Sequence, residues 1–246
     1  MHEDAGSPPT AITRLRPLLL DPPDAPDVAN GYLDLLGAQA PPAPGSIQAA
    51  WESSVGSALY TRAQGAARRW VTATRLPASV RRPPYGARVL DVGCGPGDVT
   101  AALGRAVGAE GLAIGMDVSV PMLTRAVRER SAANVGFVRA DARRPPFRDS
   151  GLALVTCLAA LQLIPSPMAV LAGMTRVLAP GGQLAVMVPT VRGGLFDRLT
   201  RVVGGRSGLA FFDPGQVAGH LHRAGLATVH THQRGPLLWI VATKET

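Results

Sequence analysis

The chain has 246 residues, of which 46% are hydrophobic and 17% charged, enough to form the core of one large domain or two small ones. Its longest apolar stretch, Leu152 to Ile164, is shorter than the roughly 18 residues that a membrane-spanning helix needs. The amino terminus has Glu3 and Asp4 where a secretory signal carries basic residues. Two cysteines are too few for a disulfide framework or a zinc site. We therefore expect a cytoplasmic protein without a membrane span or a metal.

The net charge of +8 raises the question of a nucleic-acid partner. Only one of the 25 basic residues is a lysine, Lys244, and the chain is also rich in alanine, glycine and proline. This is a general composition bias that does not depend on function. We therefore do not expect nucleic-acid binding.

Residues 1–84 have the composition of a separate amino-terminal part. Residues 1–46 contain many prolines, which exclude a long helix. Residues 47–71 follow an amphipathic helical pattern, in which apolar side chains recur every three or four residues: Trp51, Val55, Leu59, Ala63, Ala66 and Trp70. A basic stretch ending in Pro83 and Pro84 then resembles a linker. The sequence predicts an amino-terminal segment with a helical lid over 1–84 and a second domain over 85–246.

Short β-branched runs alternate with helical patterns in the second domain, as in a parallel sheet covered on both faces. The expected strands are Arg88–Val92, Leu112–Met116, Val135–Val138, Leu152–Cys157 and Gln183–Val188, followed by a hairpin over 227–243. Asp98, Ser119, Ser166 and Asp213 are predicted to cap four helices. We expect Val120 to be buried in the second of them, and Pro180-Gly181-Gly182 to end the third.

The most informative segment is a strand that runs into a glycine-rich turn, Val89-Leu90-Asp91-Val92-Gly93-Cys94-Gly95-Pro96-Gly97. Glycines at such a turn let the backbone approach a ligand closely. In nicotinamide-binding turns the third glycine follows the first by five residues, but Gly97 follows Gly93 by four. Asp98 would also oppose the phosphates at the start of the helix. The pattern therefore argues against NAD.

Two further carboxylates follow the next strands at the same edge of the predicted sheet. Asp117 comes 26 residues after Asp91, where an acid accepts hydrogen bonds from a ribose diol. Asp141 follows the third strand, where it can accept from an exocyclic amine while the N–H of Ala142 donates to a ring nitrogen. Together these residues favour recognition of an adenine nucleoside.

Over about residues 85–246 the chain resembles the class I S-adenosylmethionine-dependent methyltransferases, especially the small-molecule branch that includes quinone-biosynthesis enzymes. The resemblance lies in five motifs in order: 89–97, Gly115-Met116-Asp117-Val118-Ser119 with Met122-Leu123, 140–142, 176–182, and 212–226. It implies an α/β fold with a doubly wound, Rossmann-like, seven-stranded sheet whose last strand is antiparallel. It also implies S-adenosyl-L-methionine as the cofactor.

The resemblance also implies roles for single residues. The three glycines of the turn would admit the methionine part of the cofactor, with Asp91 near its amino group, and Asp117 would hold the ribose hydroxyls. The cofactor-binding set is completed by Val118 beside Asp117, by Met122 on the adenine face, by Asp141 and Ala142 at the adenine edge, and by Leu158 beside the methionine chain. The whole set is Asp91, Gly93, Gly95, Gly97, Asp117, Val118, Met122, Asp141, Ala142 and Leu158.

One position departs from the family pattern. Relatives often have a histidine or an aromatic residue after the fourth strand, whereas this chain has Gln162, which cannot act as a general base near neutral pH. No catalytic residue is therefore assigned. A non-catalytic cofactor-binding sensor or partner subunit and an NAD(P)-dependent oxidoreductase stay open as alternatives.

The methyl acceptor is expected to approach from the segments 47–71 and 189–212, which are rich in aromatic and aliphatic side chains. We therefore expect a small hydrophobic or lipid-like acceptor, methylated on oxygen, carbon or nitrogen. Because segment 47–71 is expected to contact the acceptor and not the cofactor, removing residues 1–70 is expected to leave cofactor binding largely intact and to abolish turnover.

Overall fold

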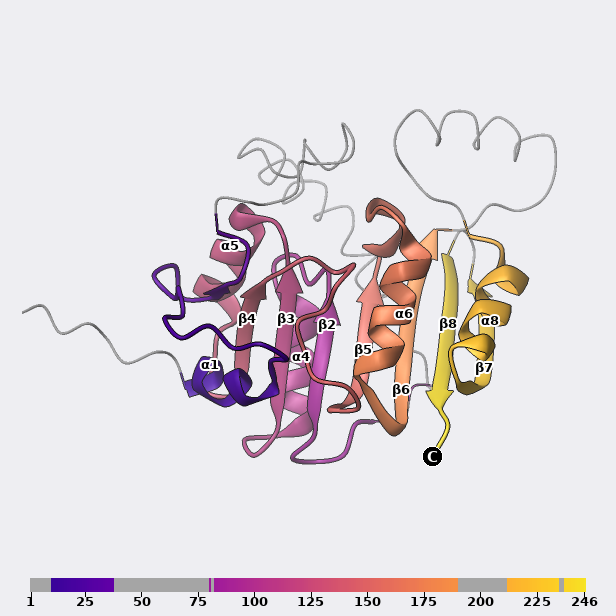
Figure 1. Ribbon diagram of the computed structural model, residues 1–246, viewed down its shortest axis with the longest axis horizontal. Coiled ribbons are helices and arrows are strands. Elements are labelled where there is room, and N and C mark those ends of the chain that lie inside the picture. Colours follow the sequence, from indigo (N-terminus) through magenta and orange to yellow (C-terminus); the bar gives the residue numbers. More distant parts are fainter. Residues whose placement is uncertain (1–9, 38–79, 81, 190–211, 235–236) are drawn as a thin grey trace, which may run out of the picture.

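A computed structural model of the chain describes residues 10–37, 80, 82–189, 212–234 and 237–246. These residues form one eight-stranded sheet with the strand order β1-β4-β3-β2-β5-β6-β8-β7 (Figure 1). The strands are β1 (Leu33–Asp34), β2 (Arg88–Val92), β3 (Leu112–Asp117), β4 (Val135–Arg139), β5 (Leu152–Leu158), β6 (Leu178–Pro189), β7 (Leu226–Arg234) and β8 (Leu237–Lys244).

The strand directions are those that the sequence resemblance implies, a parallel sheet that ends in antiparallel strands. The strands from β1 to β6 pair in parallel, and β8 pairs antiparallel with both β6 and β7. The predicted terminal hairpin is thus confirmed, with β8 inserted between β6 and β7. The order reverses at β2, whose neighbours are β3 and β5, and ligands of such sheets bind outside the carboxyl ends of the strands at this switch point.

Helices cover both faces of the sheet, which confirms the doubly wound class. On one face α4 (Asp98–Val107) and α5 (Val120–Arg130) bury Leu103, Val107 and Leu123 against strand residues such as Val89 and Phe137. On the other face lie α1 (Thr10–Leu15), α6 (Pro167–Val177) and α8 (Pro214–Arg223). Two 3₁₀ turns, η1 (Arg16–Leu18) and η3 (Leu161–Leu163), follow α1 and β5. None of the helices in these ranges is long and apolar enough to cross a bilayer.

Residues 10–37, here called the amino-terminal arm, belong to the same packed structure as the sheet. Ile12, Leu15 and Leu19 are at most 1% exposed and lie in the core cluster of the α1 face. The arm also supplies β1, which pairs with β4 and brings the count to eight strands instead of the predicted seven. Removing residues 1–70 would therefore expose part of the core. The expectation that cofactor binding survives this deletion stays a prediction. The predicted lid helix over 47–71 lies outside the described residues, and the domain division at residue 84 stays a prediction.

The four helices begin near the predicted residues, but only one of the four predicted capping side chains makes a cap bond. The N-cap of α4 is Gly97, with φ +81°, and Asp98 is its first helical residue. Ser119 is the N-cap of α5 but makes no side-chain cap bond. Ser166 likewise makes no cap bond, whereas the carboxylate of Asp213 accepts from the N–H of Gln216 as predicted.

Two more expectations need correction. Val120 is 40% exposed, because Met122, Leu123 and Ala126 form the buried side of α5. The third helix ends at Val177, and Leu178 already pairs with Leu152, so Pro180-Gly181-Gly182 lies within the bounds of β6. The chain thus passes from the helix directly into a strand that pairs in parallel with β5, with no turn between them.

Candidate functional site

The carboxyl ends of the parallel strands gather most of the predicted site residues at one edge of the sheet, the upper edge in Figure 1. Asp91 lies near the end of β2 and Asp117 ends β3, while Leu158 ends β5. Asp141 and Ala142 lie two and three residues after the end of β4. Because neighbouring parallel strands end together, residues far apart in the sequence become neighbours here.

The glycine-rich turn passes close to the segment after β5. The N–H of Gly93 donates to the carbonyl of Met116 at 2.8 Å, and a Cβ at position 93 would lie only 2.3 Å from Cβ of Ala160. Gly95 also has a positive φ, +51°, but nothing lies within 4 Å of its Cβ position. The turn is therefore packed tightly at Gly93 and leaves open space at Gly95, as a cradle for a ligand requires.

Asp117 is tied to this turn. Its Oδ2 accepts from the N–H of Gly95 and its Oδ1 from the N–H of Ser119, both at 2.9 Å. Burial raises the pKa of Asp117, while these N–H groups and that of Val118 act to lower it. Each carboxylate oxygen has a second lone pair, so Asp117 can accept two further hydrogen bonds, as a ribose diol would donate.

Asp91 lies deeper, with 2% of its surface exposed. Its two oxygens accept from the hydroxyls of Thr100 and Thr156, each at 2.8 Å. Burial raises the pKa of Asp91 to about 6, although the two hydroxyls oppose this rise. The sequence analysis did not identify Thr100 or Thr156, because single threonines in a helix and a strand carry no pattern of their own.

At the adenine edge, Asp141 has a partner that the sequence did not predict. Arg143 reaches both carboxylate oxygens, with Nε at 3.0 and 2.8 Å and Nη2 at 2.6 Å, and its N–H donates to Oδ1 at 2.9 Å. Burial would raise the pKa of Asp141, but these bonds from Arg143 hold it below its usual value. Asp141 is thus an anion already neutralised by a cation. Ala142 beside it and Met122 on α5 are 8% and 6% exposed.

The segment after β5 contains the position where the chain departs from its relatives. Leu158 packs on a small cluster of Met187, Leu237 and Trp239. Gln162 is 8% exposed, and its Nε2 donates to the carbonyl of Ala159 at 2.8 Å. Its Oε1 is buried and has no hydrogen-bond partner among the described residues. A carboxamide takes up no proton near neutral pH, so Gln162 is not a base.

The residues present fit an adenine nucleoside with a charged amino-acid tail. Gly95 leaves room beside the Asp117 carboxylate, and the hydroxyl of Ser119, two residues further on, is buried without a partner in the described part of the chain. Buried polar atoms are rarely left unpaired, so an unpaired hydroxyl beside a candidate ribose carboxylate is consistent with a ligand there. Within the same part of the chain, no three His, Cys, Asp or Glu side chains are grouped to hold a metal.

Comparison with known proteins agrees with this geometry. Residues 89–182, from β2 into β6, match the family model described as a methyltransferase domain. The matched range includes every residue of the predicted cofactor set. Residues 89–182 are thus similar to a methyltransferase domain, in agreement with the resemblance seen in the sequence.

The methyltransferase domain is also similar to a curated bacterial protein. The chain is 40% identical over 105 residues to the demethylmenaquinone methyltransferase of Geobacillus sp. (strain WCH70), and these residues are 42% of this chain and 45% of that protein. The match thus spans less than half the length of the relative.

Solved structures resemble the fold as a whole. The Haemonchus contortus phosphoethanolamine N-methyltransferase 2 in complex with S-adenosyl-L-methionine aligns with a TM-score of 0.61 at 16% identity, over 68% of this chain and 51% of that one. An S-adenosylmethionine-dependent methyltransferase from Mesorhizobium loti aligns with a TM-score of 0.58 at 17% identity, over 68% and 94%. At these identities the likeness establishes the fold of the methyltransferase domain.

Proposed function

We propose that the chain is an enzyme that transfers a methyl group from S-adenosylmethionine to a small, hydrophobic, quinone-like acceptor. The observation that carries this proposal is the hydrogen bond from Gly95 to the carboxylate of Asp117. It joins the glycine-rich turn to the acid that ends the next strand, so that one ligand can contact both.

The cofactor supplies an electrophilic methyl group on a sulfonium sulfur. The chain's own residues bind and orient. In the proposal Asp117 accepts from the ribose hydroxyls, Asp91 faces the amino group of the methionine part, and the turn from Gly93 to Gly97 admits that part closely. Val118, Met122, Asp141 and Ala142 surround the adenine, and Leu158 lies beside the methionine chain. Fixing the cofactor in this way contributes to rate by aligning the methyl group with its acceptor.

The acceptor class is supported by the similarity to demethylmenaquinone methyltransferases, which covers less than half of their length. The proposal includes a cytoplasmic location and no nucleic-acid substrate, as expected from the sequence. The methylated atom is an oxygen, carbon or nitrogen of the acceptor.

The first experiment is calorimetry of the full chain with S-adenosylhomocysteine and, separately, with NADH. We expect binding of S-adenosylhomocysteine alone. Tight binding of NADH without binding of S-adenosylhomocysteine would replace the proposal with the oxidoreductase alternative.

The second experiment measures transfer of a labelled methyl group to a demethylated quinone with a hydrophobic chain, to a simple phenol and to a small polar amine. We expect turnover with the quinone and little with the amine. Binding of S-adenosylhomocysteine without methylation of any acceptor would favour the sensor or partner-subunit alternative.

A further inference from the structure

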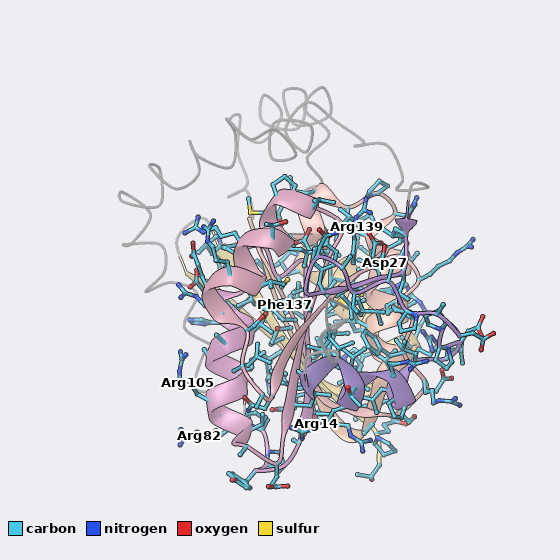
Figure 2. The ribbon with its side chains drawn as sticks, turned by 90° about the vertical axis from the view of Figure 1, so that its left-hand side faces the viewer. Arg14, Asp27, Arg82, Arg105, Phe137 and Arg139 are labelled. Atoms are coloured by element: carbon cyan, nitrogen blue, oxygen red, sulfur yellow. The ribbon has the colours of Figure 1, made fainter. Side chains whose placement is uncertain are left out.

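Arg139 is a buried cation at the carboxyl edge that the proposed function does not use. It ends β4, and only 9% of its surface is exposed. Figure 2 places it toward the end of the molecule that also carries Asp27, away from Arg14 and Arg82 at the opposite end. A buried arginine needs several acceptors to compensate for the loss of water.

The guanidinium of Arg139 joins two parts of the chain. Its Nη1 forms an ion pair with Oδ2 of Asp34 at 2.9 Å and donates to the carbonyl of Gly37, also at 2.9 Å. Its Nε donates to the carbonyl of Val118 at 3.1 Å. Asp34 and Gly37 belong to the amino-terminal arm, whereas Val118 directly follows Asp117.

The backbone reinforces the same connection. Arg139 is the register partner of Asp117 in the β3–β4 pair and of Asp34 in the β1–β4 pair. The N–H of Ala140 donates to the carbonyl of Asp117 at 3.1 Å, and the carbonyl of Arg139 accepts from the N–H of Leu35 at 3.0 Å. The arm and the candidate ribose carboxylate are therefore attached to opposite sides of one residue.

Asp34 is the anion that pairs with Arg139, and backbone N–H groups hold its carboxylate in place. Besides Arg139, its Oδ1 accepts from the N–H groups of Leu36 and Gly37, both at 2.9 Å. The side chains of Arg139 and Asp34 are 11% and 9% exposed, so solvent screens this pair far less than a surface pair. Removing one partner leaves the other as an uncompensated buried charge.

From these contacts we infer that Arg139 is a positioning residue, and that its ion pair with Asp34 couples docking of the amino-terminal arm to the geometry of the cofactor site. Arg139 does not touch the cofactor. It holds the Val118 carbonyl, and thereby the peptide next to Asp117, in place only while Asp34 compensates its charge. This inference rests on the proposed function, because Asp117 is its target.

The test compares three variants of the full chain. Asp34→Asn removes the negative charge but keeps an oxygen for the N–H groups of Leu36 and Gly37. Arg139→Lys keeps a cation but loses the planar fork that reaches three acceptors. Glu129→Gln is the control, because Glu129 pairs with Arg125 and Arg128 on the surface of α5 with 29% of its side chain exposed.

The readout is the Kd of S-adenosylhomocysteine, measured by calorimetry well below the unfolding temperature of each variant. We expect Asp34→Asn and Arg139→Lys to weaken binding by about five-fold or more, the lower end of typical coupling between two sites. Glu129→Gln should bind as the wild type does. Folded variants with the wild-type Kd and only a lower unfolding temperature would overturn the inference and leave the pair a purely structural one.

A second measurement needs no variant and covers the case in which the substitutions prevent folding. Because coupling is reciprocal, S-adenosylhomocysteine should slow backbone hydrogen exchange at Leu33–Leu35 of the wild type. Unchanged exchange there, with the ligand bound, would contradict the inference while leaving the proposed function intact. A wild type that does not bind S-adenosylhomocysteine would overturn both.

Discussion

Gly95 and Asp117 lie in successive βα units, yet the backbone N–H of Gly95 donates to Oδ2 of Asp117 at 2.9 Å. The bond closes the crossover from β2 through α4 to β3 at the edge where the sheet order reverses. A substitution at either residue therefore acts on the shape of the candidate site as well as on any direct contact with the ligand.

Replacing Asp117 with alanine should affect mainly the affinity for the cofactor. Asp117→Ala removes the acceptor of two ribose hydroxyls, with an expected loss of about 2–4 kcal/mol of binding free energy. The measurement is calorimetry with S-adenosylhomocysteine. Asp24→Ala, at an exposed position of the arm, is the matched control and should bind normally. An unchanged affinity in Asp117→Ala would remove Asp117 from the ribose site.

The two glycines of the turn should respond differently to a methyl group. Gly93→Ala brings Cβ to 2.3 Å from that of Ala160, so we expect a large loss of thermal stability. In Gly95→Ala the new methyl group meets no atom within 4 Å, so the unfolding free energy should fall only by about 1 kcal/mol, because of the positive φ. The same methyl group would occupy space that the cofactor needs, so we expect weaker binding of S-adenosylhomocysteine.

Gly225→Ala separates backbone strain from loss of the site. Gly225 has φ +86° with nothing within 4 Å of its Cβ position, and it lies in the turn between α8 and β7. This variant should lose as much stability as Gly95→Ala but keep its affinity for S-adenosylhomocysteine. If Gly95→Ala also bound S-adenosylhomocysteine normally, the open space at Gly95 would not be part of the cofactor site.

Asp91 should lower the stability of the ligand-free protein at neutral pH. Burial raises its pKa to about 6, so between about pH 4 and pH 6 the folded state holds a proton that the unfolded state has already lost, and above that range the ionised carboxylate is buried at a cost. The contribution of Asp91 to the unfolding free energy is therefore highest below pH ~4. It falls by roughly 3 kcal/mol in total as the pH rises through about 6.

Asp91→Asn cannot titrate and isolates this effect. The difference in unfolding free energy between the wild type and Asp91→Asn, measured with denaturant from pH 4 to pH 8, should shift in favour of the variant as the pH rises. Subtraction cancels the other carboxylates, such as Asp34 and Asp141, whose pKa values are lowered and whose contributions run the opposite way. A difference that does not vary with pH would show that Asp91 stays ionised in the fold.

The amino-terminal arm should be essential for stability. Leu15, at the end of α1, is 0% exposed, so Leu15→Ala should cost about 2–5 kcal/mol of unfolding free energy. Leu20 lies five residues later and is 60% exposed, so Leu20→Ala should change the unfolding free energy by about 0.5 kcal/mol or less. Denaturant unfolding of both variants tests this, and equal effects would mean that the arm does not share the core.

The sequence by itself determined the class of the sheet and most of the candidate site. Short β-branched runs alternate with helical patterns, and this alternation distinguished the parallel strands from the helices between them, because strands of a covered parallel sheet are buried on both faces. The order of Asp91, the glycine-rich turn, Asp117 and Asp141 along the chain also fixed their meeting at one edge, because each follows a parallel strand. The boundaries of β2 and the start of α8 at Asp213 with Pro214 needed only local signals.

Only the tertiary structure decided which partners these residues have. Arg139 and Asp34 are 105 positions apart, and neither lies in a periodic pattern or motif that predicts an ion pair. The arm likewise reads as a proline-rich extension, because two residues of strand and a six-residue helix are too short to leave a periodic signal. The ion pair of Arg139 and Asp34 depends on β1 adding to the edge of β4. Local sequence does not encode this contact, because its energy comes from burying residues that the rest of the fold brings together.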